Sequence, residues 1–504
     1  MGTQLVWLKR DLRLDDHRAL AKAARQGPVV GLFVFEEGLL RHPDTDASHI
    51  QFVLDALVEL RAKWEARGGL LLVRTGSAVE HLERLHRQLG FADLWSHQET
   101  GNRWTFDRDL RVARWCRERG VTWREPWQHG VVRRLRTRDG WAGQWSRRMS
   151  LPTAPEVEVF TPPEGSLPEP GRIPTLAELQ VSANPRVGAQ PGGEAAGQAL
   201  LDSFLHQRSV NYRADMASPL TAWEGCSRLS THIAFGTVSL RRIAQRTQER
   251  IEQLREEARG GGPVPGTWLP SLASFQSRLS WHCHFMQRLE DAPDMEEQEL
   301  NPAYAGMVEG HEDRALLEAF ARGETGYPMV DASMRCLRET GWINFRMRAM
   351  LVSFGTHHLA QRWQDIGRIL APLFLDYEPG IHWSQVQMQA AVVGINTIRI
   401  YSPEKQARDQ DPQGEFIRRW VPELEPVPTE FLAAPHQTPP LLAASLGLNL
   451  EALYPRPIVD PKAAVRAARE RLAAIRTRAT TRDHARRVFQ QHGSRRAPLG
   501  RARR

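Results

Sequence analysis

Residues 4–35 read QLVWLKRDLRLDDHRALAKAARQGPVVGLFVF and contain two apolar runs separated by a helical pattern. The runs Gln4–Leu8 and Val29–Phe35 have the length of buried strands. Between them, Asp15-Asp16 offers an N-terminal cap for a helix over residues 17–25. A strand, a helix and a second strand in this order predict a βαβ unit with parallel strands.

The same alternation continues through the first 130 residues. Apolar residues recur at helical spacing over residues 50–64, before the stop signal Gly68-Gly69. No Walker-type phosphate loop and no strand-linked GxGxxG is present, so the usual nucleotide fingerprint is missing. We therefore expect an α/β domain over residues 1–135, with a parallel, Rossmann-like sheet covered by helices on both faces. The further strand candidates are Leu70–Val73, Asp93–Ser96 and Val121–Trp123.

The rest of the chain changes character twice. Residues 136–199 are rich in Pro and Gly and lack apolar periodicity, which predicts an interdomain linker that crosses the surface. Helical patterns dominate residues 200–424, so we expect an all-α domain there. Residues 425–504 form a C-terminal extension with a helix over 461–478 and a basic, disordered end.

The composition is that of a water-soluble globular protein, with 41% hydrophobic and 25% charged residues. No apolar run is long enough for a membrane span, and the first strand follows the N-terminus directly, so we expect a cytoplasmic protein. The net charge of +8 is concentrated at the C-terminus. Residues 461–504 hold 14 basic and 2 acidic side chains, which leaves 53 basic and 57 acidic ones for residues 1–460.

Cysteine and histidine spacing does not favour a metal site. The four cysteines form no Cys-x-x-Cys pair, so we expect free thiols and neither a zinc site nor an iron–sulfur cluster. Neighbouring side chains on a helix point about 100° apart, so His282-Cys283-His284 is interpreted as structural. The cysteines are Cys116, Cys226, Cys283 and Cys336.

Two segments of the helical half carry candidate chemistry. Residues 224–230, Glu-Gly-Cys-Ser-Arg-Leu-Ser, bring a glycine, hydroxyls and an arginine to a helix start, which suits a pyrophosphate. A helix cap beside a surface arginine explains the same residues. Arg346 and Arg348 are two residues apart and cannot share one helical face, so one can meet a buried ligand and the other a groove. A buried arginine needs a partner, and Asp376 is the candidate carboxylate.

Five motifs, taken in order, resemble the photolyase/cryptochrome flavoprotein family over roughly residues 3 to 424. They are Trp7-x-Lys9-Arg10-Asp11-Leu12-Arg13-x-x-Asp16, Ser227-Arg228-Leu229-Ser230, Thr325-Gly326-Tyr327-Pro328-x-Val330-Asp331-Ala332-x-Met334-Arg335, Thr340-Gly341-Trp342, and Asp411-Pro412-x-Gly414-x-Phe416-Ile417-Arg418-Arg419-Trp420-Val421-Pro422-Glu423-Leu424.

This resemblance implies that the helical domain binds FAD. It also implies that Arg348, paired with Asp376, lies beside the isoalloxazine ring and places a positive charge there. The cofactor contacts carried over are Tyr212, Cys226, Ser227, Arg228, Leu229, Ser230, Arg348, Asp376, Tyr377 and Glu378.

The resemblance further implies a chain of tryptophans that passes electrons to the flavin. Trp383 resembles the flavin-proximal member and Trp363 the middle one. Phe320 fills the outer position, and phenylalanine is too hard to oxidise for that role. The last step must then use another tryptophan, a tyrosine, or nothing. Core packing alone explains most tryptophans of a sequence.

Positions that face the substrate match the family only in part. Trp281, Trp342 and Arg346 match, whereas Arg278 replaces a glutamate and Phe345 an asparagine. These replacements change the polarity of the pocket and should alter which lesion fits. A second, antenna chromophore of the folate or deazaflavin type is also implied, since Glu99 and Asn102 lie where a folate segment would be, although Arg103 replaces an expected acid.

The leading hypothesis is a blue-light-driven DNA photolyase that splits pyrimidine dimers in UV-damaged DNA after flipping the lesion out of the stack. Its expected catalytic residues are Trp383, Trp363, Trp281 and Arg346, with no metal and no membrane partner. The alternative is a cryptochrome-type photoreceptor that signals to a protein partner through flavin photoreduction. A flavoprotein that has lost its light response is the third reading.

Overall fold

The computed structural model describes residues 2–181, 184–308 and 313–493 of the chain. Contacts divide the chain into two compact units. The first consists of Met1–Ser209, Ser227–Pro293 and Leu375–Gly380, and the second of Val210–Cys226, Asp294–Phe374 and Ile381–Arg504. Each unit is described by itself.

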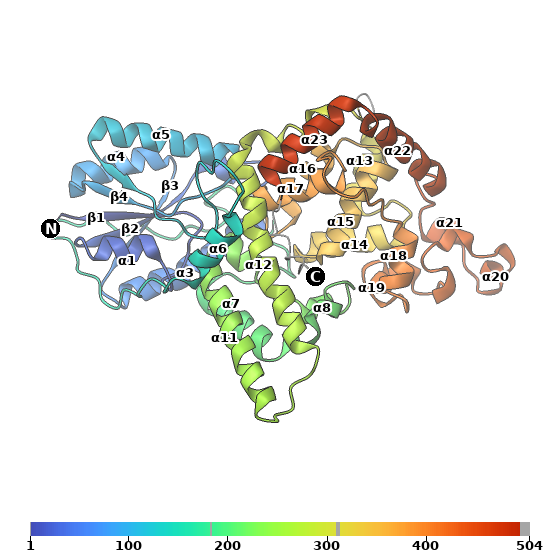
Figure 1. Ribbon diagram of the computed structural model, residues 1–504, viewed down its shortest axis with the longest axis horizontal. Helices are drawn as coiled ribbons and strands as arrows, with labels where there is room; N and C mark the ends of the chain where they lie inside the picture. The colour runs from blue at the N-terminus through green and yellow to red at the C-terminus, as the bar shows by residue number, and fades with distance from the viewer. Residues whose placement is uncertain (1, 182–183, 309–312, 494–504) are drawn as a thin grey trace, which may run out of the picture. The chain divides into compact units, whose positions relative to one another are not determined.

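A five-stranded parallel sheet forms the centre of the first unit, with the strand order β3-β2-β1-β4-β5 (Figure 1). Every residue of β1 and β2 is buried, as expected for strands covered on both faces. The expected α/β class with a parallel sheet is therefore confirmed. The strands are β1 Gln4–Leu8, β2 Val29–Phe35, β3 Leu70–Thr75, β4 Asp93–Trp95 and β5 Thr122–Arg124.

Helices cover both faces of this sheet because side chains alternate along each strand. Val6 and Leu8 join one apolar cluster with residues of α1 and α3, and Leu5 and Trp7 join another with residues of α4 and α5. The first-unit helices are α1 Arg18–Ala24, α2 Glu37–Leu40, α3 Ala47–Glu65, α4 Ala78–Leu89, α5 Arg103–Arg119, α6 Trp141–Ser150, α7 Glu194–His206, α10 Ser230–Ala234, α11 Leu240–Arg259 and α12 Trp268–Asp291.

The helix cap predicted at Asp15-Asp16 is wrong. Helix α1 is capped by His17, whose Nδ1 accepts a hydrogen bond from the Leu20 amide at 3.0 Å. The backbone of Asp16 is left-handed, with φ of 51°, and its carboxylate binds the buried guanidinium of Arg241 on α11 instead. A charged donor is a stronger hydrogen-bond partner than a neutral backbone amide, which explains this preference.

The segment predicted as a linker, residues 136–199, is rich in loops but also contributes to the core of the first unit. Helix α6 lies within it, and α7 begins before its predicted end. Phe160 stacks on Trp64 of α3 with ring centroids 4.4 Å apart, and Leu179 is buried in the same apolar cluster. Two anchoring side chains therefore hold this segment against the α/β layer.

The second unit is helical throughout the part of it that the structure describes. Its central helix, α14, has Pro328 in its first turn and ends at Gly341 in the left-handed conformation, both favourable positions for these residues. A π-helical turn, Phe354–His358, follows α15. The helices up to residue 420 are α8 Tyr212–Asp215, α9 Ala222–Gly225, α13 Arg314–Arg322, α14 Pro328–Thr340, α15 Phe345–Ser353, α16 Trp363–Leu370, α17 Pro379–Gln389, of which the first two residues fall in the first unit, α18 Pro403–Gln410 and α19 Glu415–Trp420.

The C-terminal extension folds against the second unit. The Tyr454 hydroxyl donates a hydrogen bond to the Asp331 carboxylate, and the Tyr327 hydroxyl donates one to the carbonyl of Val459 at 2.8 Å. Helix α22 packs against the π-helical turn. The helices of the extension are α20 Pro440–Ser445, α21 Leu450–Leu453, α22 Pro461–Arg476 and α23 Ala479–His492.

Helix α23 occupies residues for which the basic composition suggested disorder. Three of its side chains are buried (Thr481, Val488 and His492), and it packs against the short turn Pro302–Tyr304. Burial of this face supplies the stabilisation that composition alone does not reveal. The last part of the predicted disordered end, residues 494–504, lies outside the described residues. A search of the described helices found none with the length and apolar character of a membrane span.

Candidate functional site

The Ser-Arg-Leu-Ser segment is held rigidly in the first unit. The backbone of Arg228 has φ of 58°, a left-handed conformation that costs a non-glycine residue about 1 kcal/mol and is often found at functional sites. Side chains of Gln190 and Arg208 donate hydrogen bonds to the carbonyls of Arg228 and Ser227, at 3.2 and 3.3 Å. Ser230 is the first residue of α10. The segment therefore presents two hydroxyls and a guanidinium on a fixed backbone.

Tyr377 and Glu378 belong to the same unit and are fixed by different contacts. The Tyr377 hydroxyl donates to the carboxylate of Asp44 at 2.5 Å, and Arg10 donates to the Tyr377 carbonyl at 3.3 Å. Glu378 is buried and lies 2.6 Å from Nε2 of His282. The preceding residue, Asp376, is also buried.

His282 and Glu378 form a buried ion pair. Burial works against a charged imidazole, but the Glu378 carboxylate outweighs it and raises the pKa of His282 to about 10. Burial likewise works against a charged carboxylate, but the imidazolium holds the pKa of Glu378 below its ordinary value. Burial and the same imidazolium lower the pKa of His129 to about 3, so His129 is neutral. His282 is therefore the charged member of this histidine pair.

The other members of His282-Cys283-His284 make contacts of their own. The Cys283 thiol accepts a hydrogen bond from the Gly130 amide at 3.3 Å. The His284 ring meets the Trp281 ring edge to face, with centroids 5.1 Å apart. Sγ of Cys283 also lies 3.8 Å from Nδ1 of His282, whereas His284 packs on Trp281. The structural interpretation of the three residues stays a prediction. All four cysteines are free.

A buried carboxylate shared by two histidines was missed by the sequence reasoning. Oδ2 of Asp11 lies 2.7 Å from Nδ1 of His97 and 3.1 Å from Nε2 of His17. Nδ1 of His17 accepts a hydrogen bond from the Leu20 amide, and its Nε2 faces the Asp11 carboxylate. Burial opposes ionisation of the Asp11 carboxyl group, but the two imidazoles hold its pKa well below the ordinary value. Asp11 follows the end of β1, and His97, 86 positions later, follows the end of β4. No local sequence pattern connects them.

The residues expected near an antenna chromophore are engaged within the first unit. Glu99 is buried between Arg108, at 2.5 Å, and Lys9, at 3.3 Å. Burial opposes ionisation of Glu99, but these cations lower its pKa to about 2. Asn102 caps α5 by accepting a hydrogen bond from the Thr105 amide at 3.1 Å, and Arg103 pairs with Asp107 on the protein surface.

The residues expected to face a lesion lie on α12 in the first unit and, in the second unit, at the start of α15 and in the turn before it. On α12 in the first unit, Arg278 is exposed and Trp281 is half-buried one turn further along. At the start of α15 in the second unit, Phe345 is 45% exposed. Trp342 is buried and meets Trp223 edge to face, with ring centroids 5.6 Å apart.

The two arginines of α15 have different surroundings. Arg346 donates to Oε1 of Gln406 on α18 at 3.5 Å. The guanidinium of Arg348 lies over the ring of Phe374, 4.0 Å from its centroid, and its Nε donates to the Ile343 carbonyl at 3.1 Å. The two guanidinium groups thus have different neighbours within the second unit, and the assignment of one to a ligand and the other to a groove stays a prediction. The pairing of Arg348 with Asp376 stays a prediction.

Trp363 and Trp383 are in contact in the second unit. Their ring centroids are 5.8 Å apart, the rings are nearly perpendicular, and both side chains are buried. The close packing requires a glycine at position 367, because an added Cβ there would come within 2.2 Å of the Trp383 ring. Phe320 is fully buried and stacks on Phe354. Phe320 therefore packs as an ordinary core side chain.

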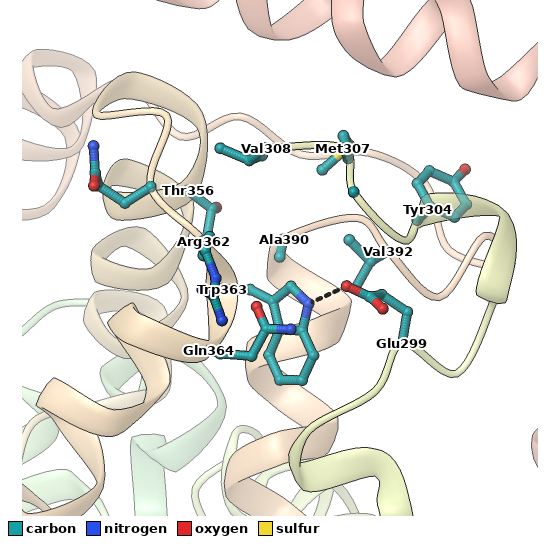
Figure 2. Close-up of a pocket in the computed structure, with 12 residues that line it drawn as sticks. Glu299, Tyr304, Met307, Val308, Thr356, Arg362, Trp363, Gln364, Ala390 and Val392 are labelled. Atoms are coloured by element: carbon teal, nitrogen blue, oxygen red, sulfur yellow. Dashed lines mark hydrogen bonds between the residues drawn. The ribbon is translucent and has the colours of Figure 1, made fainter. Parts of the chain in front are cut away.

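A cavity of about 360 Å³ borders Trp363 (Figure 2). The indole Nε1 of Trp363 donates a hydrogen bond to Oε1 of Glu299 at 3.0 Å. Sequence reasoning missed Glu299, because a single glutamate 64 positions away carries no motif. Polar side chains of Thr356, Gln361, Arg362 and Gln364 and apolar ones of Tyr304, Met307, Val308, Ala390 and Val392 complete the lining.

Comparisons with known proteins cover both units. Residues 4–142 match the sequence profile described as "DNA photolyase", and residues 275–474 match "FAD binding domain of DNA photolyase". A deoxyribodipyrimidine photo-lyase of Thermus thermophilus is 31% identical over 440 residues, which cover 84% of this chain and 93% of the relative. The chain belongs to the photolyase/cryptochrome family.

Members of this family with different names resemble the chain almost equally. A cryptochrome DASH of Gloeobacter violaceus is 27% identical over 497 residues, covering 91% of this chain and 93% of the relative. The crystal structure of a class III photolyase from Agrobacterium tumefaciens has a TM-score of 0.80 at 24% identity, covering 95% of this chain and 98% of that one. The family fold, an α/β domain followed by an all-α FAD-binding domain, is thereby established. The relatives include both photolyases and cryptochromes.

Proposed function

We propose that this protein is a blue-light-driven, FAD-dependent DNA photolyase that splits pyrimidine dimers in UV-damaged DNA. The observation that carries the proposal is the similarity to a deoxyribodipyrimidine photo-lyase over nearly the full length of both chains. Retention of Trp281, Trp342 and Arg346 at the positions expected to face a lesion supports it.

The donor groups of the chain fit a dinucleotide cofactor. Ser227, Ser230 and Arg228 offer hydroxyl and guanidinium donors suited to a pyrophosphate, from a backbone that hydrogen bonds hold in place. Arg348 would place its positive charge beside the flavin ring, with Asp376 as its counter-ion. Tyr212, Cys226, Leu229, Tyr377 and Glu378 would complete the contacts. When bound, FAD would supply light absorption and one-electron transfer.

The side chains proposed to face DNA have the chemistry that a flipped lesion needs. A half-buried indole such as Trp281 offers a stacking surface, and stacking of a base on an aromatic ring contributes about 1–3 kcal/mol. Arg346 would contact a phosphate, so binding should weaken as the salt concentration rises. Phe345 would extend the apolar surface next to Arg346.

A cryptochrome-type photoreceptor is the second candidate. Two replacements favour it. The exposed Phe345 stands where the resemblance implies an asparagine, and Arg278 stands where it implies a glutamate. In that case the altered surface would face a signalling protein, and Trp363 and Trp383 would serve photoreduction alone. An antenna chromophore of the folate or deazaflavin type remains part of either proposal.

Repair of a defined lesion tests the first proposal against the second. The purified full chain, loaded with FAD and photoreduced, is incubated with oligonucleotides that carry a cyclobutane dimer or a 6-4 product. Restored bases should appear under blue light and not in the dark. Failure to restore either lesion by protein that still photoreduces its FAD would favour the receptor.

A matched pair of variants on α12 controls this experiment. Trp281→Ala should keep its FAD and lose repair, because the stacking surface is removed. Trp268→Ala, on the same helix, removes an indole that donates to the Ser209 hydroxyl at 2.8 Å and should leave repair unchanged. Equal repair by both variants would remove Trp281 from the proposed site.

A further inference from the structure

The two tryptophans in contact differ in what their indole N–H groups meet. Nε1 of Trp363 donates to the Glu299 carboxylate at 3.0 Å, as Figure 2 shows. Nε1 of Trp383 is buried and has no acceptor among the residues that the structure describes. Oxidation of an indole greatly increases the acidity of its N–H. Of the two rings, Trp363 can therefore pass its proton to a base within hydrogen-bond reach.

The position of the proton decides where the electron vacancy rests. If Trp383 is oxidised first, an electron from Trp363 can refill it across the 5.8 Å contact. Loss of the Trp363 proton to Glu299 then leaves a neutral indole radical, which has a weaker pull on electrons than the cation. The vacancy is held at Trp363. No outer tryptophan is needed for this, which fits the buried phenylalanine at position 320.

The cavity borders Trp363 of this pair. Trp363 is only 4% exposed, but it lines a space of about 360 Å³, within the usual size range of small-molecule pockets. The rim includes Arg362 and Gly306, which are exposed, so the space reaches the protein surface. Glu299 and Arg362 are its charged lining groups, and Arg362 also lies 3.5 Å from Asp365.

We propose that Glu299 accepts the indole proton of oxidised Trp363, and that the adjoining cavity admits a small thiol that restores this tryptophan. The thiolate gives one electron to the neutral indole radical, and Glu299 returns the proton to Nε1. The products are intact Trp363, the Glu299 carboxylate and a thiyl radical that leaves the cavity. This inference rests on the photoreduction in the proposed function and adds the residue and the space that end the electron chain.

Flash spectroscopy of FAD-loaded full-length protein tests the proton transfer. After a blue flash, the unaltered protein should show the neutral tryptophan radical. Glu299→Gln should show the cation radical instead, with proton loss slowed by about 10²-fold, the lower range for a positioned proton acceptor. Glu297→Gln is the matched control, because Glu297 lies in the same segment and pairs with Arg368 at the surface.

The outcomes separate this inference from the proposed function. The same radical form in the unaltered protein and in Glu299→Gln would overturn the role of Glu299 while leaving photoreduction intact. Trp383→Phe should show no tryptophan radical. If the unaltered protein also showed none, this inference would be overturned, while the repair assay would still decide the proposed function. In the dark, the ¹⁵N shift of the Trp363 indole should change in Glu299→Gln and stay unchanged in Glu297→Gln. An unchanged shift in both would exclude the hydrogen bond itself.

A concentration series tests the cavity. Recovery of Trp363 should accelerate with added dithiothreitol and reach a plateau, as expected for a reductant that binds before it reacts. Val308→Phe, which adds bulk to the lining, should slow recovery without changing proton loss. Val187→Phe places the same ring at a position that is 93% exposed and should have no effect. A strictly linear series, equal in all three proteins, would refute the cavity as the point of entry.

Discussion

His282 owes its charge mainly to Glu378, on a segment 96 positions away, and the adjacent Cys283 adds to the effect. Burial alone would leave this imidazole neutral, as it leaves His129. The carboxylate at 2.6 Å reverses that outcome. Removing one partner of such a pair leaves an uncompensated buried charge, which typically costs about 3–5 kcal/mol. The pair is therefore a point at which stability depends on pH.

We expect the stability contribution of His282 to be lost in alkaline solution. Its pKa is raised from 6.5 to about 10, so the contribution is full below pH 6.5 and disappears as the pH rises through 10. The pKa of Glu378 is lowered from 4.5, so its contribution is full above pH 4.5 and falls in more acidic solution. His282→Gln should lower the Tm most near pH 6 and least near pH 10.

The measurement is thermal unfolding of FAD-loaded protein at several pH values, compared between the unaltered chain, His282→Gln and His206→Gln. His206 lies at the exposed end of α7 and controls for a simple change of surface charge. A loss of Tm in His282→Gln that is the same at every pH would contradict the ion pair.

At this scale, the sequence predicted residue types better than partners. The structural interpretation of His282-Cys283-His284 rests on helical geometry, which is local, and it stays a prediction. The partners Glu378, Gly130 and Glu299 lie far away along the chain, and no pattern in one sequence connects them. The cluster of Asp11, His17 and His97 was missed for the same reason, because His97 lies 86 positions from Asp11.

At the scale of elements, apolar periodicity predicted the strands closely and composition misjudged the C-terminal end. The five strands were found because each is a short apolar run between helical patterns. Helix α23 was not predicted because its sequence is dominated by charged and polar residues, and only a few of its side chains face the core. Packing against a neighbouring turn, which a sequence does not display, makes it an ordered element.

Truncation of the basic end should separate DNA affinity from folding. Deletion of residues 494–504 removes five arginines and should leave the FAD content and the Tm unchanged while lowering affinity for duplex DNA at low salt. Deletion of residues 479–504 also removes α23 and its three buried side chains, so the Tm should fall as well. Binding is measured by fluorescence anisotropy at roughly 50 and 200 mM salt. If the chain that lacks only residues 494–504 binds DNA as the full chain does, the basic end is not a DNA-binding segment.

At the scale of the whole molecule, the residues proposed to hold FAD come from both compact units. Ser227, Arg228 and Glu378 belong to the first, and Tyr212 and Arg348 to the second. The fold class could be predicted because it depends on local patterns and on five motifs in order. How the chain divides by its contacts could not, since residues 227–293 join the first unit although their helical pattern resembles that of the second.

Bound FAD should order the segments whose residues are proposed to contact it. We expect removal of FAD to increase backbone hydrogen exchange around residues 227–230 and around 345–349, with smaller changes in β1 and β2, because bound ligand stabilises the segments that it contacts. Hydrogen–deuterium exchange of FAD-loaded and FAD-depleted protein, followed by mass spectrometry, measures this. Protection confined to one unit would contradict the proposed set of contacts.

Gly367 has no Cβ, and its absence sets how closely the rings of Trp363 and Trp383 can approach. Electron tunnelling weakens steeply as donor and acceptor move apart, so a shift of a few tenths of an ångström changes the rate without altering either redox partner. An alanine at this position would press on the edge of the Trp383 ring and displace it. In the proposed electron chain, Gly367 would act as a spacer, and the transfer rate would depend on a position that carries no chemistry of its own.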